Sequence, residues 1–295
     1  MPLRFAHTSD IHLLDLQGVA PWRYFNKRIT GRLNLALRRG KKHDSSLFDR
    51  ATAKAHALGA ERLVVTGDLT NLSLESEFAL VRRKLDALPM PATVIPGNHD
   101  TYTRGAVADG RCEQFLGHHM DGQREPGHAY PFVQRFDGVA LVGLNTGIAT
   151  PPFRAVGKLG DGQLARLATV LATLRQEGRS RVVLIHHPVM AGESGDHKRL
   201  LDLDAFGAVI AEHGAELVLH GHEHRRIDGT LPGPEGDAVV HGIASGTSLS
   251  EDSGRRASFS LYDADASSIR RTIYQWNGSE FISDETSELR VAWAA

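Results

Sequence analysis

The chain of 295 residues is 41% hydrophobic and 23% charged, with a formal net charge of only -1; it can bury a sizeable core, and we expect a single domain over residues 1–295. Its one cysteine, Cys112, excludes an intrachain disulfide and a thiolate-rich zinc site. No uncharged apolar run approaches the ~20 residues that cross a bilayer, and the first residues lack the apolar core of a signal peptide, so we expect a cytoplasmic protein.

Short β-rich runs alternate with helical patterns along most of the chain. We expect strands within residues 3–10, 61–68, 90–100, 139–145, 181–188 and 215–224, and helices over residues 45–59, 73–88, 161–177 and 200–213. This alternation is typical of βαβ units on a buried sheet. From about residue 238 the pattern changes to β-rich runs separated by turns, which predicts that this C-terminal part forms a second sheet packed against the first.

Five of these strands end in side chains that can bind a divalent cation: Asp10 and His12, Asp68, Asn98 and His99, His186, and His222 and His224. The carboxyl ends of parallel strands converge at one edge of an open sheet, so residues distant in sequence can share a site. In "DIH" and "HEH" the two candidates lie two residues apart, which on extended backbone directs both to the same side. The sequence therefore predicts a metal site built from nitrogen and oxygen ligands.

The motifs "DIH", "GD", "GNHD", "HHP" and "GHEH" occur in this order between about residues 8 and 224. Together they resemble the calcineurin-like metallophosphoesterases. The resemblance implies an α/β fold, a four-layer αββα sandwich of two mixed β-sheets flanked by helices, with two metal ions at its edge. It further implies one metal held by Asp10, His12 and His224, a second held by Asn98, His186 and His222, a bridging Asp68, and a catalytic His99 oriented by Asp100.

The chemistry of these residues agrees with that resemblance. Carboxylate, amide and imidazole ligands suit Mn, Fe or Zn without selecting among them. A metal pair ~3.5–4 Å apart can share a bridging hydroxide that attacks phosphorus in line with the leaving oxygen. A protonated His99 would stabilise or protonate the leaving alkoxide. We therefore expect a dinuclear metal-dependent phosphodiesterase that acts on a cyclic nucleotide or another small phosphodiester.

Two alternative functions remain open. The first is hydrolysis of a lipid-linked phosphoester or pyrophosphate, as in the UDP-diacylglucosamine pyrophosphatases. The second is a non-catalytic scaffold of the same fold, which is disfavoured because every metal position is filled. Among the other residues, Asn98 and His187 are candidates for substrate contact, and His118 and His119 for a substrate cap. We expect structural roles for the three remaining histidines near the strands, His7, His220 and His241.

Residues 22–43, here called the basic segment, read "WRYFNKRITGRLNLALRRGKKH", with eight Lys or Arg and no Asp or Glu. We expect a basic amphipathic helical insertion at about residues 18–43, with an apolar stripe formed by Trp22, Phe25, Ile29, Leu33, Ala36 and Leu37. The stripe could pack on the core, or contact a lipid substrate or a membrane surface. The cations, Arg28 and Arg32 among them, could instead bind the phosphate of the substrate. We do not expect nucleic acid as a partner, because the remaining chain is acidic.

Overall fold

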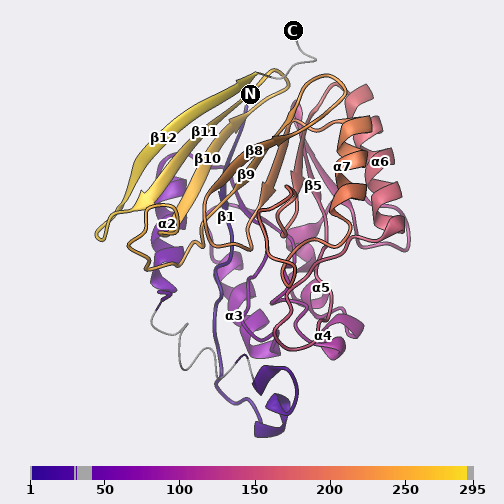
Figure 1. Ribbon diagram of the computed structural model, residues 1–295. Helices are drawn as coiled ribbons and strands as arrows, with labels where there is room; N and C mark the ends of the chain where they lie inside the picture. Colours follow the sequence, from indigo (N-terminus) through magenta and orange to yellow (C-terminus); the bar gives the residue numbers. More distant parts are fainter. Residues whose placement is uncertain (1, 30, 32–41, 291–295) are drawn as a thin grey trace.

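The computed structural model describes residues 2–29, 31 and 42–290, and its main feature is a pair of mixed β-sheets flanked by helices (Figure 1). In strand order, the first sheet contains β12 (Phe281–Arg290), β11 (Ser268–Trp276), β10 (Ser258–Ala264), β1 (Leu3–Thr8), β2 (Arg62–Val65) and β3 (Ala92–Val94). The second contains β4 (Phe132–Phe136), β5 (Val139–Gly143), β6 (Ser180–Leu184), β7 (Leu217–His220), β9 (Ala238–Gly242) and β8 (Ile227–Leu231). The α/β fold with two mixed sheets, expected from the sequence, is confirmed.

Helices connect the parallel strands within each sheet, and others link the first sheet to the second. They are α2 (Ser46–Ala57), α3 (Glu75–Asp86), α4 (Arg104–Ala108), α5 (Arg111–Leu116), α6 (Asp161–Gln176) and α7 (Leu203–His213), with short 3-10 helices η1 (Pro21–Tyr24) and η3 (Gly117–Met120). β1, β2 and β3 run parallel with α2 and α3 between them, and β5, β6 and β7 run parallel with α6 and α7 between them. None of the described helices is both long and apolar enough to cross a membrane.

The central strands of the second sheet, β5, β6 and β7, are buried on both faces. Leu141 and Leu184 belong to the hydrophobic cluster that fills the space between the sheets, together with Phe5 of β1. Their neighbours Val142 and Val183 point the other way, into a second cluster beneath α6 and α7. This alternation follows from the period of two along a strand, and it explains why these strands read as continuous apolar runs. Figure 1 shows α6 and α7 side by side over the outer face of this sheet.

The C-terminal strands differ from the sequence expectation. β9 joins the second sheet beside β7, but β10, β11 and β12 extend the first sheet, where β10 pairs antiparallel with β1. The expectation that residues from about 238 belong to a second sheet therefore holds for β9 and is wrong for β10, β11 and β12. Alternating hydrophobicity identifies a strand and its buried face, but it does not say which sheet edge the strand will extend.

The described part of the basic segment also differs from a continuous helix with its apolar stripe on the core. η1 ends at Tyr24, a turn follows at residues 25–27, and helical conformation resumes at Arg28. The side chains of Trp22, Phe25 and Ile29 are 70%, 78% and 51% exposed, whereas Tyr24 and Arg28 are buried. The remainder of the predicted stripe, and Arg32, lie outside the described residues.

Candidate metal centre

The ligand candidates lie in tight turns that follow β1, β2 and β7. Five of them, Asp10, His12, Asp68, His222 and His224, have φ between 46 and 72°. This left-handed conformation is uncommon for residues other than glycine, so the extended backbone that we expected for "DIH" and "HEH" is wrong. Main-chain hydrogen bonds hold the turns together: the Asp10 N–H donates to the Gly67 carbonyl and the His12 N–H to the Asp68 carbonyl, each at 3.0 Å.

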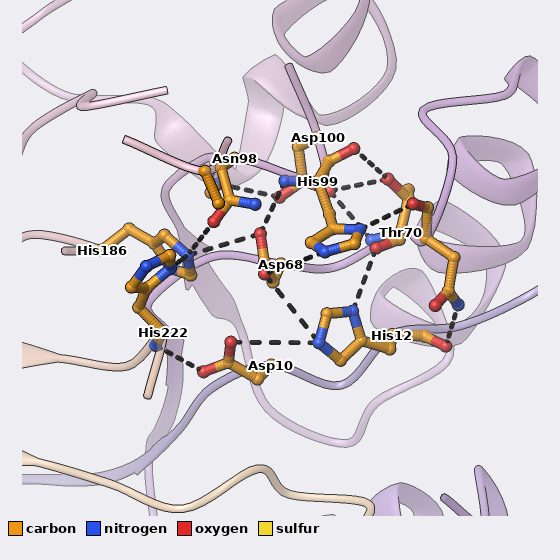
Figure 2. Close-up of polar contacts among 12 residues, drawn as sticks. Asp10, His12, Asp68, Thr70, Asn98, His99, Asp100, His186 and His222 are labelled. Carbon is orange, nitrogen blue, oxygen red and sulfur yellow. Dashed lines mark hydrogen bonds and ion pairs between the residues drawn. The ribbon is translucent and has the colours of Figure 1, made fainter. Parts of the chain in front are cut away.

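One group of ligand atoms comes from Asp10, His12, Asp68 and His224, and these atoms all lie within 4.8 Å of one another. Figure 2 shows the side chains of Asp10, His12 and Asp68 directed toward one another. His224 Nε2 is 3.2 Å from Asp10 Oδ1 and 3.0 Å from His12 Nε2. His12 Nε2 is 3.9 Å from Asp68 Oδ2. Buried Asp10 Oδ1 has no hydrogen-bond partner among the described residues. Convergent nitrogen and carboxylate atoms with an unsatisfied buried oxygen fit a divalent cation.

A second group contains Asp68, His186 and His222. His186 Nε2 lies 3.4 Å from Asp68 Oδ1, 3.2 Å from His222 Nδ1 and 3.1 Å from the Asn98 side-chain oxygen. The other ring nitrogen of His186 is 2.8 Å from the Thr66 carbonyl, an acceptor, which leaves Nε2 as the ligand atom. Asp68 belongs to both groups, with one carboxylate oxygen toward each, as a bridging ligand requires.

The electrostatics of these residues require positive charge at the centre. Burial acts to raise the pKa of Asp68, but His186 and His99 hold it well below the ordinary value. Burial acts to lower the pKa of His186, but the Asp68 and Asp10 carboxylates raise it to about 9. The negative charges of the buried Asp10 and Asp68 carboxylates must therefore be balanced by positive charge, which an imidazolium or a divalent cation can supply.

His99 lies beside the Asp68 carboxylate, with its Nε2 4.0 Å from Asp68 Oδ2. Its Nδ1 lies 2.7 Å from the Asn71 carbonyl, and its ring stacks on Tyr102 with 5.4 Å between ring centroids. A carbonyl oxygen can accept a hydrogen bond but cannot donate one. The Nδ1–H of His99 is therefore directed at the Asn71 carbonyl, and Nε2 faces the centre. The orienting group is thus Asn71, and the expectation that Asp100 orients His99 is wrong.

Asp100 instead connects the loops that carry the ligands. Its carboxylate accepts hydrogen bonds from the backbone N–H groups of Leu69, Thr70 and Gly97 at 3.1, 2.9 and 2.9 Å. These bonds hold the turn after Asp68 against the turn that carries Asn98. Asp100 therefore acts on the centre through the backbone.

The structure places the candidate substrate contacts away from open solvent. Both nitrogens of His187 are in contact with other groups, Nδ1 at 2.7 Å from Thr146 Oγ1 and Nε2 at 3.0 Å from the Ala155 carbonyl, so its predicted substrate contact is not supported. Arg28 donates to the carbonyls of Leu72 and Ser73 at 2.7 and 2.9 Å, which anchors the basic segment to the loop before α3.

Three other histidines are buried or half-buried in polar contacts. His7 Nε2 lies 2.9 Å from Thr66 Oγ1, His220 Nδ1 lies 3.1 Å from the Gly221 carbonyl, and His241 Nδ1 lies 3.0 Å from the Tyr262 hydroxyl. These contacts agree with the structural roles expected for them.

Two residues near the centre were missed in the sequence. The ring of His43 lies 5.6 Å from those of His12 and His224, and its Nδ1 is 3.0 Å from Thr247 Oγ1. Lys27 is half-buried, with Nζ 4.5 Å from the centroid of the Tyr102 ring. Both belong to the basic segment, whose cations were the only sequence signal for them.

Lys27 also lines a cavity of about 600 Å³ beside Tyr102. Its charged lining residues are Arg23, Lys27, Arg28, Arg104, Asp109 and Arg111. Five of these six side chains are cationic. Arg23 and Arg111 are paired with Glu75, and Arg111 also with Asp109, which still leaves more positive than negative charge and favours anions. Through Tyr102, which stacks on His99, the cavity adjoins the metal centre.

The comparison with known protein families agrees with the arrangement of the candidate metal ligands. Residues 3–226 match the family model described as calcineurin-like phosphoesterase. The chain belongs to the calcineurin-like phosphoesterase family. A curated member described as a probable cyclic nucleotide phosphodiesterase, from Synechococcus sp., is 30% identical over 166 residues. That match covers 55% of this chain and 57% of the relative, so the chain spans little more than half of the relative's length.

Solved structures of two phosphatases share the fold. A dimetal phosphatase from Danio rerio superimposes with a TM-score of 0.63 at 14% identity, over 96% of this chain and 99% of that chain. Purple acid phosphatase PPD1 from yellow lupin (Lupinus luteus) seeds gives 0.63 at 13% identity, over 98% of this chain and 54% of that chain. The two ligand groups thus lie in the fold of the calcineurin-like phosphoesterase family, and each could hold a metal ion.

Proposed function

We propose that this protein is a dinuclear-metal phosphodiesterase. The observation that carries the proposal is Asp68, which joins two groups of ligand atoms and lies 4.0 Å from His99 Nε2. When bound, two such cations supply a nucleophilic water at neutral pH and neutralise the phosphoryl oxygens. His99 is held by Asn71 so that Nε2 faces the centre, where its protonated form can donate to the leaving oxygen.

The preference for a diester rests on the space beside His99. A phosphodiester carries an organic group on each side of phosphorus, and the 600 Å³ cavity beyond Tyr102 can receive one of them. Its cationic lining favours a group that carries further negative charge. The probable cyclic nucleotide phosphodiesterase of Synechococcus sp. supports the same class of substrate.

A substrate comparison tests this proposal. Manganese-reconstituted protein would be assayed with bis(p-nitrophenyl) phosphate, p-nitrophenyl phosphate and cyclic nucleotides. We expect kcat/KM for the diesters to exceed that for the monoester by about tenfold or more, a difference of about 1.4 kcal/mol in transition-state stabilisation. Equal or higher kcat/KM for the monoester would overturn the diester proposal while leaving the metal-dependent hydrolase intact.

A lipid-linked phosphoester or pyrophosphate is the second candidate substrate, and one observation favours it. Phe153 is a further exposed apolar residue, in addition to Trp22, Phe25 and Ile29, and its side chain is 85% exposed. Phe153 precedes Arg154, whose carbonyl accepts a hydrogen bond from Lys27 Nζ at 3.2 Å. These apolar side chains thus flank the cationic cavity, an arrangement that suits an anionic lipid surface.

Vesicle co-sedimentation separates the two candidates. We expect the protein to bind vesicles with anionic lipid, and the double variant Trp22→Ser/Phe25→Ser to lose most of that binding. Ile282→Ser removes an exposed apolar side chain of β12 and serves as the matched control. If the unmodified protein does not bind such vesicles, the lipid candidate is rejected.

A further inference from the structure

A third group of metal-ligating side chains lies outside the dinuclear centre. It consists of Asp86, the last residue of α3, and of His118 and His119 in η3, and we call it the remote cluster. One ligand atom from each residue lies within 4.8 Å of the others. Asp86 Oδ1 is 2.7 Å from His118 Nε2 and 3.1 Å from His119 Nε2. η3 directly follows α5, which packs against α3 (Figure 1).

Neighbouring groups orient the carboxylate and one imidazole of the remote cluster. Asp86 Oδ2 accepts a hydrogen bond from Arg82 Nε at 3.3 Å, so Oδ1 is the oxygen directed at the histidines. The buried His119 ring hydrogen-bonds the backbone of Ala92 in β3. Its Nε2 is buried and makes no well-aligned hydrogen bond among the described residues, although Asp86 Oδ1 lies 3.1 Å away. Metal-binding histidines are commonly oriented in this way, through the nitrogen that does not bind the metal.

The orientation of His119 leaves a repulsion that a cation would remove. If the Ala92 carbonyl takes the ring N–H, the neutral ring presents the lone pair of Nε2 to the carboxylate oxygen 3.1 Å away. A proton on His118 can satisfy Asp86, but it does nothing for His119 Nε2. A positive ion among the three atoms satisfies all of them.

The distances suit a small tetrahedral ion. Zinc bonds of about 2.0–2.2 Å to nitrogen and oxygen place neighbouring ligand atoms about 3.3 Å apart. The two separations from Asp86 Oδ1, 2.7 and 3.1 Å, need only a small expansion to reach this value. A cavity of about 650 Å³ adjoins the three residues, with room for water at a fourth position. Two imidazoles and one carboxylate favour zinc over calcium or magnesium, which prefer oxygen ligands.

We propose that Asp86, His118 and His119 bind one Zn²⁺ ion, separate from the dinuclear centre. The ion would tie the C-terminal end of α3 to η3 and the neighbouring β3.

Zinc counting in a variant without the dinuclear centre tests the proposal. Asp68→Ala protein would be dialysed against micromolar Zn²⁺, and zinc per chain would be measured by mass spectrometry. We expect one zinc to remain. The double variant Asp68→Ala/His118→Ala should lose it, whereas Asp68→Ala/His128→Ala should keep it. His128 is the matched control because it is an exposed histidine beside an acid, Glu125, at 3.9 Å, with no second histidine.

A second zinc measurement uses protein that retains Asp68, so that its result does not depend on the folding of the Asp68 variants. In the otherwise unmodified protein, His118→Ala should lower zinc from three to two ions per chain. His118 is partly exposed, with 42% of its side chain accessible, so its removal should not disturb folding. Unchanged zinc content after His118→Ala would overturn the proposal and leave the remote cluster as an ordinary ion pair.

Discussion

The dinuclear centre and the described part of the basic segment lie close together but are built in opposite ways. The side chains of Asp10 and His186 are fully buried, and their turns are tied to strand ends by main-chain hydrogen bonds. Trp22 and Phe25, by contrast, project into solvent. A centre of this kind holds reacting groups in fixed positions, whereas an exposed segment can contact part of the substrate remote from phosphorus. The difference suggests that chemistry and substrate choice reside in different parts of the chain.

The largest effect should come from the bridging carboxylate. Asp68→Ala removes the ligand shared by both groups, so we expect both ions of the dinuclear centre to be lost and phosphodiester hydrolysis to fall by about 10³-fold or more. Metal analysis and an assay with bis(p-nitrophenyl) phosphate check this. Asp196→Ala, at a fully exposed acid, is the control. Retention of two ions at the centre would show that Asp68 is not the bridge.

His99→Ala separates proton transfer from metal binding. We expect both metals to remain and the rate to fall by about 10²–10⁴-fold, because a positioned acid typically contributes that much. The loss should be larger for an alkyl leaving group than for p-nitrophenolate, which needs little protonation. Full activity of the variant on a diester with a poor leaving group would rule out the general-acid role.

Lys27→Met tests the contribution of the basic segment to substrate binding. We expect kcat/KM for an anionic diester to fall about tenfold with little change in metal content, since one buried cation of the cavity is lost. Burial lowers the pKa of Lys27 to about 8. The unmodified protein should therefore lose kcat/KM above about pH 8 as the ammonium deprotonates, and Lys27→Arg should extend activity to higher pH.

The control for Lys27 is Lys54→Met, which removes a cation on α2. If Lys27→Met and Lys54→Met have the same small effect on kcat/KM, the cavity does not bind the substrate, and the contrast between the two regions is wrong.

The smallest effect concerns Glu77, which supports the loop where the two regions meet. Its carboxylate accepts hydrogen bonds from the N–H groups of Asn71, Leu72 and Leu74. Asn71 orients His99, and the Leu72 carbonyl anchors Arg28. Burial nevertheless raises the pKa of Glu77 from 4.5 to about 7.

The raised pKa of Glu77 predicts a pH dependence of stability. The folded chain binds more protons than the unfolded chain between about pH 4.5 and 7, so the free energy of unfolding should fall as the pH rises through this window. The contribution is about 1–3 kcal/mol. Glu77→Gln should flatten this part of the profile in urea unfolding experiments, whereas Glu251→Gln, at an exposed position, should not. An unchanged slope in the Glu77 variant would contradict the raised pKa.

Much of the fold and the centre could be predicted because both depend on local patterns. Val142 and Val183 lie in apolar runs that identify buried strands, and Asp68 and His186 follow such runs directly. Strand ends in an α/β sheet converge, so these side chains meet. The pairing of β10 with β1 could not be predicted, because an edge strand is chosen by tertiary packing and not by its own alternation.

The sequence by itself determined which side chains can serve as metal ligands, since their chemistry and their positions after buried strands are written in the order of residues. Only the tertiary structure decided that Asn71, not Asp100, orients His99, and that Trp22 and Phe25 face solvent while Arg28 is buried. The physical reason is that these outcomes depend on contacts between segments far apart in the chain. A helical period indicates that one face differs from another, but the neighbours available on folding determine which face is covered.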